Sequence, residues 1–192
     1  MVSRKDPTDV QTIVDITPKA ATYWYDQKDL MDIEEFVLLA KDCGLLEILT
    51  RYLECSPCFD MMTSWCSFPA NGADSASAQL FHFDLDRIKF LKVFIYLTDV
   101  TESNGPHVFV LGSHKRTADV AYHDGRYSDE EVKSLLPDCP HVSLCGPAGT
   151  VFVEDTLGFH KGKPVEDGMR CVFEYQYSVC EFGYPYSDVT LK

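Results

Sequence analysis

The sequence predicts a mainly β fold with flanking helices, in which short strands build a jelly-roll or barrel core. Two observations lead to this prediction. Helical periodicity dominates the first part of the chain, and from residue 59 onward short β-rich runs alternate with turn residues. The chain has 192 residues, a length that suits one domain. We therefore expect a single domain over residues 1–192, with a helical part at 1–58 that packs on a β core at 59–180.

The helical part contains two amphipathic segments. The first, Asp29–Lys41, has apolar residues at the spacing of one helix face, namely Leu30, Ile33, Phe36, Val37 and Ala40. Gly44 is a suitable residue to end this helix. The second segment, Leu45–Leu53, repeats the pattern, and such faces usually pack on a core.

The β part contains seven candidate strands separated by Asn-Gly and Gly-Pro turn signals. They are Phe59–Phe68, Gln79–Phe83, Lys89–Leu97, His107–Leu111, His141–Cys145, Gly149–Val153 and Arg170–Val179. One helix interrupts them. Ser128 to Glu131 forms a capping box, and Pro137 ends the helix in a long connection at about 112–140.

Charge and composition narrow the functional classes. Seventeen basic and thirty acidic residues give a net charge of −13, which repels phosphate backbones and anionic lipid. We therefore expect neither nucleic-acid binding nor membrane binding. We also read no signal peptide and no membrane-spanning stretch, and the eight cysteines are typical of buried, reduced thiols in a cytoplasmic protein. The pair Cys55 and Cys58 lacks the partners that would complete a zinc site.

The strongest chemical signal is His82-Phe83-Asp84, at the end of a strand-like run. Residues i and i+2 of a strand share one face, so His82 and Asp84 can direct a nitrogen and an oxygen at one point. His160, which follows another predicted strand, is the best third ligand. Two histidines and one carboxylate form the facial triad of non-heme iron enzymes.

Arg170 adds a second signal, ten residues after His160. Alternation along Arg170–Val179 places Arg170 on the same face as Val172, Glu174 and Gln176. An arginine inside a barrel needs an anionic partner. Each motif alone has an ordinary structural explanation, and their order along the chain is what favours a shared site.

At these residues the chain resembles the phytanoyl-CoA dioxygenase family. The resemblance rests on three segments and covers roughly residues 45–180: His82 to Val100, the Asn-Gly turn and Gly-Ser-His segment at Ser103 to Lys115, and Gly149 to Arg170. It implies a double-stranded β-helix and an enzyme that uses Fe(II), O2 and 2-oxoglutarate. Such an enzyme converts 2-oxoglutarate to succinate and CO2 and hydroxylates a substrate.

By position, the resemblance makes His82, Asp84 and His160 the iron ligands and Arg170 the 2-oxoglutarate anchor, with Phe94 beside the cosubstrate. Asp84 favours hydroxylation over halogenation, because related halogenases have a small residue there. Lys92 shares the face of Phe94 and is able to pair with an anion in the lumen.

Two features depart from the family pattern. Gly162 stands where many members have a serine or threonine that helps to hold the cosubstrate. Only 81 residues precede His82, fewer than in many relatives, which leaves the site more open or closed by a second subunit.

The substrate and the oligomeric state are not predicted. Without a basic groove for a CoA diphosphate we favour a small metabolite, and we expect specificity from Asn71–Ser77, Lys115–Tyr127 and Glu181–Lys192. Two alternatives remain open: a non-catalytic relative that binds a metal or metabolite, and a cupin-type metalloenzyme that uses no 2-oxoglutarate.

Overall fold

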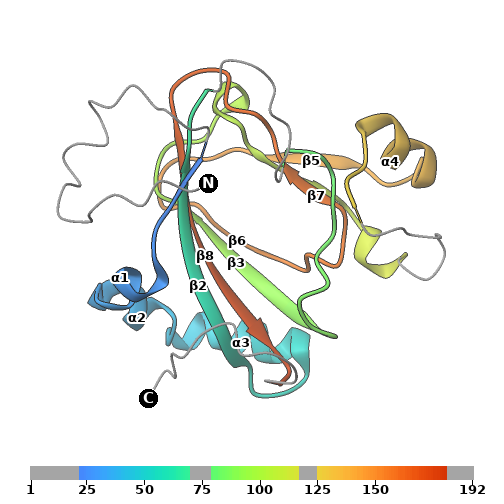
Figure 1. Ribbon diagram of the computed structural model, residues 1–192. Coiled ribbons are helices and arrows are strands. Elements are labelled where there is room, and N and C mark those ends of the chain that lie inside the picture. The colour runs from blue at the N-terminus through green and yellow to red at the C-terminus, as the bar shows by residue number, and fades with distance from the viewer. Residues whose placement is uncertain (1–21, 70–78, 117–124, 181–192) are drawn as a thin grey trace.

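The computed structural model describes residues 22–69, 79–116 and 125–180, and within them eight strands form two antiparallel sheets that face each other (Figure 1). The larger sheet has the order β1 (Thr22–Trp24), β2 (Cys58–Ser67), β8 (Arg170–Ser178), β3 (Phe90–Tyr96) and β6 (Val151–Glu154). The smaller sheet has the order β5 (His141–Leu144), β4 (His107–Val110) and β7 (His160–Gly162). The predicted mainly β, jelly-roll fold is confirmed.

The inner strand of the larger sheet, β8, separates two environments by strict alternation. Arg170, Val172 and Glu174 line the space between the sheets. Phe173 and Tyr175 point the other way, into a core shared with the helices. The alternation expected from the sequence is thus what positions the lumen-facing residues.

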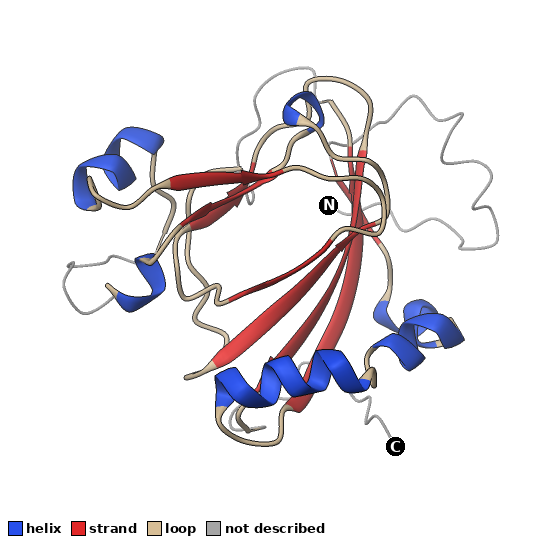
Figure 2. Ribbon diagram, turned by 180° about the vertical axis from the view of Figure 1, so that it is seen from behind, coloured by secondary structure: helices blue, strands red, loops and turns tan. Residues whose placement is uncertain are grey.

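Three helices cover the outer face of the larger sheet, where α3 runs across it (Figure 2). They are α1 (Gln27–Met31), α2 (Glu34–Leu39) and α3 (Cys43–Leu53). Leu49 and Leu53 of α3 are buried against this sheet. The hydroxyls of Tyr175 and Tyr177 donate to the carbonyls of Phe36 and Ala40, each at 2.7 Å. The helical part is therefore bound to β8 by both packing and hydrogen bonds.

The smaller sheet has its own helix, α4 (Asp129–Leu135). The predicted capping box is confirmed, because Glu131 N–H donates to the Ser128 hydroxyl and Ser128 N–H donates to the Glu131 carboxylate. Val132 of α4 packs in a second core with Phe81 and Phe159. Two 3-10 turns, Glu102–Asn104 and Ser113–Lys115, flank β4.

The single helix predicted over Asp29–Lys41 is wrong in one respect, since the segment forms two helices with Ile33 extended between them. The break lets Leu30 enter the core while the carbonyl of Phe36 reaches Tyr175. Gly44 does not end a helix. It lies in the first turn of α3, because the Asp42 side chain accepts from Leu45 N–H at 2.8 Å and caps the helix there.

The strand predictions hold for most runs, with two exceptions. Gln79–Phe83 forms isolated bridges at Phe81 and His82 rather than a strand, and β6 begins two residues later than predicted and extends to Glu154. The strands β1 and β7 were not predicted, because three residues are too few to show a period.

The expectation of reduced, buried cysteines is wrong for several of them. Cys66 and Cys171 are opposite each other on β2 and β8 and form a disulfide. Cys43, Cys145 and Cys180 are exposed.

Candidate active site

The two histidines of the predicted triad are direct backbone neighbours. His82 N–H donates to the carbonyl of His160 at 3.0 Å, and His160 N–H donates back to the carbonyl of His82 at 2.9 Å. Asp84 N–H donates to the carbonyl of Thr156 at 2.8 Å. The segment that carries His82 and Asp84 is therefore held against the segment that carries His160, although 78 positions separate the histidines in the sequence.

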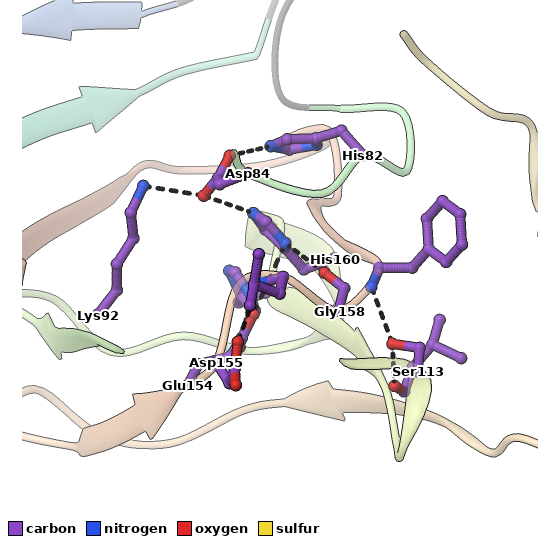
Figure 3. Close-up of polar contacts among 12 residues, drawn as sticks. His82, Asp84, Lys92, Ser113, Glu154, Asp155, Gly158 and His160 are labelled. Carbon is purple, nitrogen blue, oxygen red and sulfur yellow. Dashed lines mark hydrogen bonds and ion pairs between the residues drawn. The ribbon is translucent and has the colours of Figure 1, made fainter. Parts of the chain in front are cut away.

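Hydrogen bonds to backbone carbonyls orient both imidazole rings in the same way, and Figure 3 shows the one between His160 and Gly158. The Nδ1 atom of His82 lies 3.0 Å from the carbonyl of Leu80, and that of His160 lies 3.0 Å from the carbonyl of Gly158. A backbone carbonyl requires an N–H donor, so each Nδ1 is protonated and each Nε2 has a free lone pair. These Nε2 atoms face the Asp84 carboxylate, at 3.9 Å from His82 and 3.5 Å from His160.

The three side chains thus form a compact group, with ligand atoms all within 4.8 Å of one another. Of the described residues, they are the only group of three or more potential ligands that meets this geometry. The structure brings His82, Asp84 and His160 together, as the sequence predicts.

The protonation states suit a metal site. Burial lowers the pKa of His160 to about 4 and also lowers the pKa of His82. Burial acts to raise the pKa of Asp84, but the nearby His160 and Lys92 outweigh it and hold that pKa at about 2. At neutral pH the site offers two neutral imidazoles and one carboxylate, the forms that coordinate a cation.

The position of His160 depends on Ser113, in the predicted Gly-Ser-His segment. The buried Ser113 hydroxyl accepts from Phe159 N–H at 2.8 Å and donates to the carbonyl of Val110 at 2.7 Å. Gly158 allows this approach, since a Cβ there would lie 2.7 Å from both the Phe109 ring and the Ser113 hydroxyl. Figure 3 shows Ser113 beneath the histidine segment.

A buried lysine contacts the triad from β3. The Lys92 ammonium lies 2.9 Å from Asp84, 3.3 Å from Asp86 and 3.5 Å from Glu174. Burial acts to lower the pKa of Lys92, but Glu174 and Asp84 outweigh it and raise that pKa above its usual value. The sequence indicated an anion partner for Lys92 in the lumen, and two of its three carboxylate partners, Asp84 and Glu174, line the cavity.

The sequence reading missed a buried His107–Glu154 pair next to His160. The Nε2 atom of His107 lies 2.9 Å from Glu154, and a Glu154 oxygen lies 3.8 Å from His160 Nδ1. The ring of His107 is nearly parallel to that of His160, with centroids 5.5 Å apart. Burial lowers the pKa of His107 to about 3 and raises that of Glu154 to about 7.

Arg170 extends into the other end of the lumen. Its guanidinium donates to the carbonyl of Gly105 and lies over Gly162, where an added Cβ would be 2.8 Å from Nη2. Arg170 Nε is buried without a hydrogen-bond partner among the described residues. A buried guanidinium with an unused donor is suited to an incoming carboxylate.

One cavity of about 180 Å³ connects the triad with Arg170. Phe94 lines it and stacks on Phe152 with centroids 5.0 Å apart. Its lining includes Trp24, Trp65, His82, Asp84, Lys92, Phe94, His107, Phe152, His160, Gly162, Lys163, Arg170 and Glu174.

The family follows from a sequence comparison. The profile of the phytanoyl-CoA dioxygenase (PhyH) family matches residues 11–170, which is most of the chain. The protein belongs to the phytanoyl-CoA dioxygenase family. The resemblance noted in the sequence is thereby confirmed, and the three triad residues and Arg170 all lie in the matched region of this family member.

Solved structures share the fold of this PhyH-family chain at low sequence identity. The epimerase SnoN of nogalamycin biosynthesis, in complex with Fe3+, alpha ketoglutarate and nogalamycin RO, has a TM-score of 0.61 and 17% identity, with 82% of this chain and 63% of SnoN covered. EctD from S. alaskensis, with 2-oxoglutarate and 5-hydroxyectoine, has a TM-score of 0.57 and 18% identity, with 82% and 56% covered. AviO1 from Streptomyces viridochromogenes Tue57 has a TM-score of 0.55 and 19% identity, with 80% and 64% covered.

The chain thus spans less than two thirds of the length of each of these relatives. A search of curated proteins gave no match. None of the helices in the described part of this family member has the length and apolar character that a membrane crossing needs.

The predicted specificity segments fall largely outside the described residues. Asn71–Ser77 and Glu181–Lys192 lie wholly outside them, as does the 117–124 part of Lys115–Tyr127. Among the described residues of or next to the middle segment, His114, Arg116 and Arg126 do not line the cavity.

Proposed function

We propose that the protein is an Fe(II)- and 2-oxoglutarate-dependent oxygenase that hydroxylates a small molecule. The observation that carries this proposal is the shared orientation of His82 and His160. Both Nδ1 atoms bond to backbone carbonyls, so both Nε2 atoms are left to face the Asp84 carboxylate. Backbone bonds of this kind orient metal-ligating histidines in many proteins.

The donor set fits Fe(II). Two imidazoles and one carboxylate on one side of a cation leave other coordination positions open, as non-heme iron oxygenases require. The buried, neutral histidines and the ionised Asp84 need no proton loss to coordinate. Family membership supports the same choice, and the SnoN and EctD structures contain iron and the oxo-acid.

The other end of the cavity fits the cosubstrate. Arg170 is nine-tenths buried, and its Nε has no partner among the described residues. The far carboxylate of 2-oxoglutarate would bond to this guanidinium, and Phe94 would pack against the carbon chain from β3. With Gly162 in place of a hydroxyl residue, Arg170 is the main polar contact that we propose for this carboxylate.

In the loaded enzyme, the metal and 2-oxoglutarate would supply the oxidising chemistry. The chain's own residues bind and orient. Ser113 and the backbone pairing hold His160, the stack of Phe94 and Phe152 excludes water from one side of the lumen, and Lys92 keeps Asp84 ionised. The proteins that share the fold include the epimerase SnoN and the carbocyclase SnoK as well as EctD with 5-hydroxyectoine. We propose hydroxylation rather than halogenation because the carboxylate ligand Asp84 is present.

The test separates binding from turnover. Calorimetry without O2 should give one site for Fe(II) and, once iron is bound, one site for 2-oxoglutarate. Exposure to O2 should then produce succinate. His82→Ala and Asp84→Ala should abolish iron binding and succinate formation, whereas Lys28→Ala, at an exposed position of α1, should change neither.

The alternatives give different results. Full succinate formation in either triad variant overturns the ligand assignment. Metal and 2-oxoglutarate binding without any succinate indicates a non-catalytic relative. Metal-dependent activity that survives Arg170→Leu, with no 2-oxoglutarate binding, indicates a cupin-type enzyme.

A further inference from the structure

A histidine and a glycine face each other at the Arg170 end of the cavity. His107 of β4 is paired directly with Gly162 of β7. Residues that are directly opposite in an antiparallel pair have their side chains on the same face, with Cβ positions about 5 Å apart. Both residues line the cavity, so the imidazole of His107 lies beside the space that a side chain at position 162 would fill.

The same space borders the guanidinium of Arg170. A Cβ on Gly162 would lie 2.8 Å from Nη2 and 3.1 Å from Nη1 of Arg170. On the proposed function, this end of the cavity binds the far carboxylate of 2-oxoglutarate. His107 therefore lies next to both the guanidinium and the carboxylate that would bind to it.

Three contacts fix the ring of His107. Its centroid lies 5.5 Å from that of His160 and 5.0 Å from that of Phe94. The Nε2 atom lies 2.9 Å from the Glu154 carboxylate, which occupies one of the two ring nitrogens. Nδ1 is then the polar atom of the ring that remains for a ligand. The imidazole thus lies between the triad and Arg170, along the proposed position of the cosubstrate.

Lys163 is a second candidate for contact with this carboxylate, because it follows Gly162 and also lines the cavity. Its ammonium, however, lies 2.7 Å from the exposed carboxylate of Glu102. This ion pair holds the lysine toward the surface. The side chain of His107 is only 12% exposed, so His107 is the better placed of the two for a buried carboxylate.

We propose that His107 is a cosubstrate-binding residue, whose Nδ1–H donates to the far carboxylate of 2-oxoglutarate beside Arg170. It would supply from β4 the contact that Gly162 cannot give from β7. A carboxylate beside Nδ1 favours the state with a hydrogen there, while Nε2 and Glu154 share the other proton. This inference rests on the proposed function for the identity of the ligand.

Binding measurements without turnover test this role. The Fe(II)-loaded protein, kept without O2, would be titrated with 2-oxoglutarate by calorimetry. The analogue 2-oxopentanoate, which has a methyl group in place of the far carboxylate, would be measured by competition. His107→Phe keeps a flat ring and removes the N–H. It should raise the Kd of 2-oxoglutarate about tenfold, for the loss of one hydrogen bond to a charged group, and change the Kd of 2-oxopentanoate less than about threefold.

Two further variants locate the effect. The amide of His107→Asn places an N–H near the position of Nδ1, so the Kd of 2-oxoglutarate should stay within about threefold of the wild type. His141→Phe is the matched control, because His141 lies on the neighbouring β5, is exposed and does not line the cavity. It should change neither Kd. Fe(II) affinity should be the same in all these proteins, since no substitution removes a proposed ligand.

The outcomes separate the inference from the proposed function. An unchanged Kd of 2-oxoglutarate in His107→Phe overturns the role of His107, and so does an equal loss for the two oxo-acids or an equal loss in His107→Phe and His107→Asn. If the wild type binds no 2-oxoglutarate, the proposed function fails and the inference fails with it.

Thermal melting shows whether each variant is folded. Should His107→Phe not fold, the double variant His107→Phe with Glu154→Leu takes its place, because it also removes the carboxylate that would be left without its partner. The same comparison of the two oxo-acids then decides the role of His107.

Discussion

The ammonium of Lys92 lies 2.9 Å from Asp84 Oδ2, the same carboxylate oxygen that lies 3.5 Å from His160 Nε2. One oxygen therefore serves both the lysine and the triad. The lysine neutralises a buried carboxylate in the metal-free protein, and a metal at the triad would share that carboxylate with it.

Lys92→Met should destabilise the metal-free protein. It leaves Asp84, Asp86 and Glu174 without their common cation, and removal of one partner from a buried pair costs about 3–5 kcal/mol of unfolding free energy. A divalent metal would restore part of that charge balance, so the rise in Tm on metal addition should be larger than in the wild type. The matched control is Lys89→Met, whose ammonium is more exposed and pairs with the exposed Glu54. Equal melting curves for the wild type and Lys92→Met would contradict the role of this lysine.

Gly162→Ala should weaken the binding of 2-oxoglutarate without weakening the binding of the metal. The new Cβ would lie 2.8 Å from Nη2 of Arg170, so the guanidinium must move from its position over the glycine. A shift of this size in a carboxylate anchor should raise the KM for 2-oxoglutarate about tenfold or more. Metal affinity, measured by calorimetry on the same sample, should stay unchanged. An unchanged KM would show that Arg170 tolerates the shift or does not hold the cosubstrate.

Glu154→Gln should stabilise the metal-free protein at alkaline pH. Burial raises the pKa of Glu154 to about 7 in the folded protein, against about 4.3 for an unfolded glutamate. The folded state therefore holds this proton more tightly than the unfolded state, and stability falls as pH rises from about 4 to about 7.

Above that range the ionised Glu154 carboxylate lowers the free energy of unfolding by roughly 4 kcal/mol, a cost that the amide of the variant avoids. Urea unfolding at pH 8 and at pH 4 should show the gain of the variant at the higher pH and none at the lower. The same gain at both values would exclude ionisation as its cause.

Reduction of the Cys66–Cys171 disulfide should lower Tm. The bond closes a long loop, with a sequence separation of 105 residues, for which the chain-entropy model gives about 4–5 kcal/mol. Cys66→Ser with Cys171→Ser should melt at the temperature of the reduced wild type. Cys55→Ser is the control, since Cys55 is a free thiol. Identical melting of the wild type with and without reductant would contradict this prediction.

Much of the lumen could be predicted from strand alternation. The pattern along Arg170–Val179 placed Arg170 and Glu174 on one face, and both line the cavity. The spacing of His82 and Asp84 also predicted their convergence, although the segment is only bridged to its neighbours rather than part of a sheet. An extended backbone is enough to give residues i and i+2 a common direction.

The buried polar residues around the triad were less predictable. Glu154 lies one residue beyond the strand expected at Gly149–Val153, where a glutamate usually faces solvent. His107 was read as the first residue of a strand, and no local pattern links it to Glu154, which is 47 positions away. Alternation from Phe152 would have directed Glu154 inward, had β6 been extended by one residue.

The prediction of a single helix over Asp29–Lys41 was wrong for a different reason. Its periodicity describes one continuous face, but the contacts that decide its path are the tyrosine hydroxyls of β8 and the burial of Leu30. These partners lie more than 130 positions away in the sequence. No pattern within the segment reports on them.

The two-way backbone pairing of His82 with His160 means that the coordination geometry exists before any ion arrives. On the proposed ligand set, a chelator should strip the metal and leave the polypeptide in its native shape. Cobalt(II) could then be introduced into the same three-ligand site, where its visible absorption would report each later occupant of the open positions.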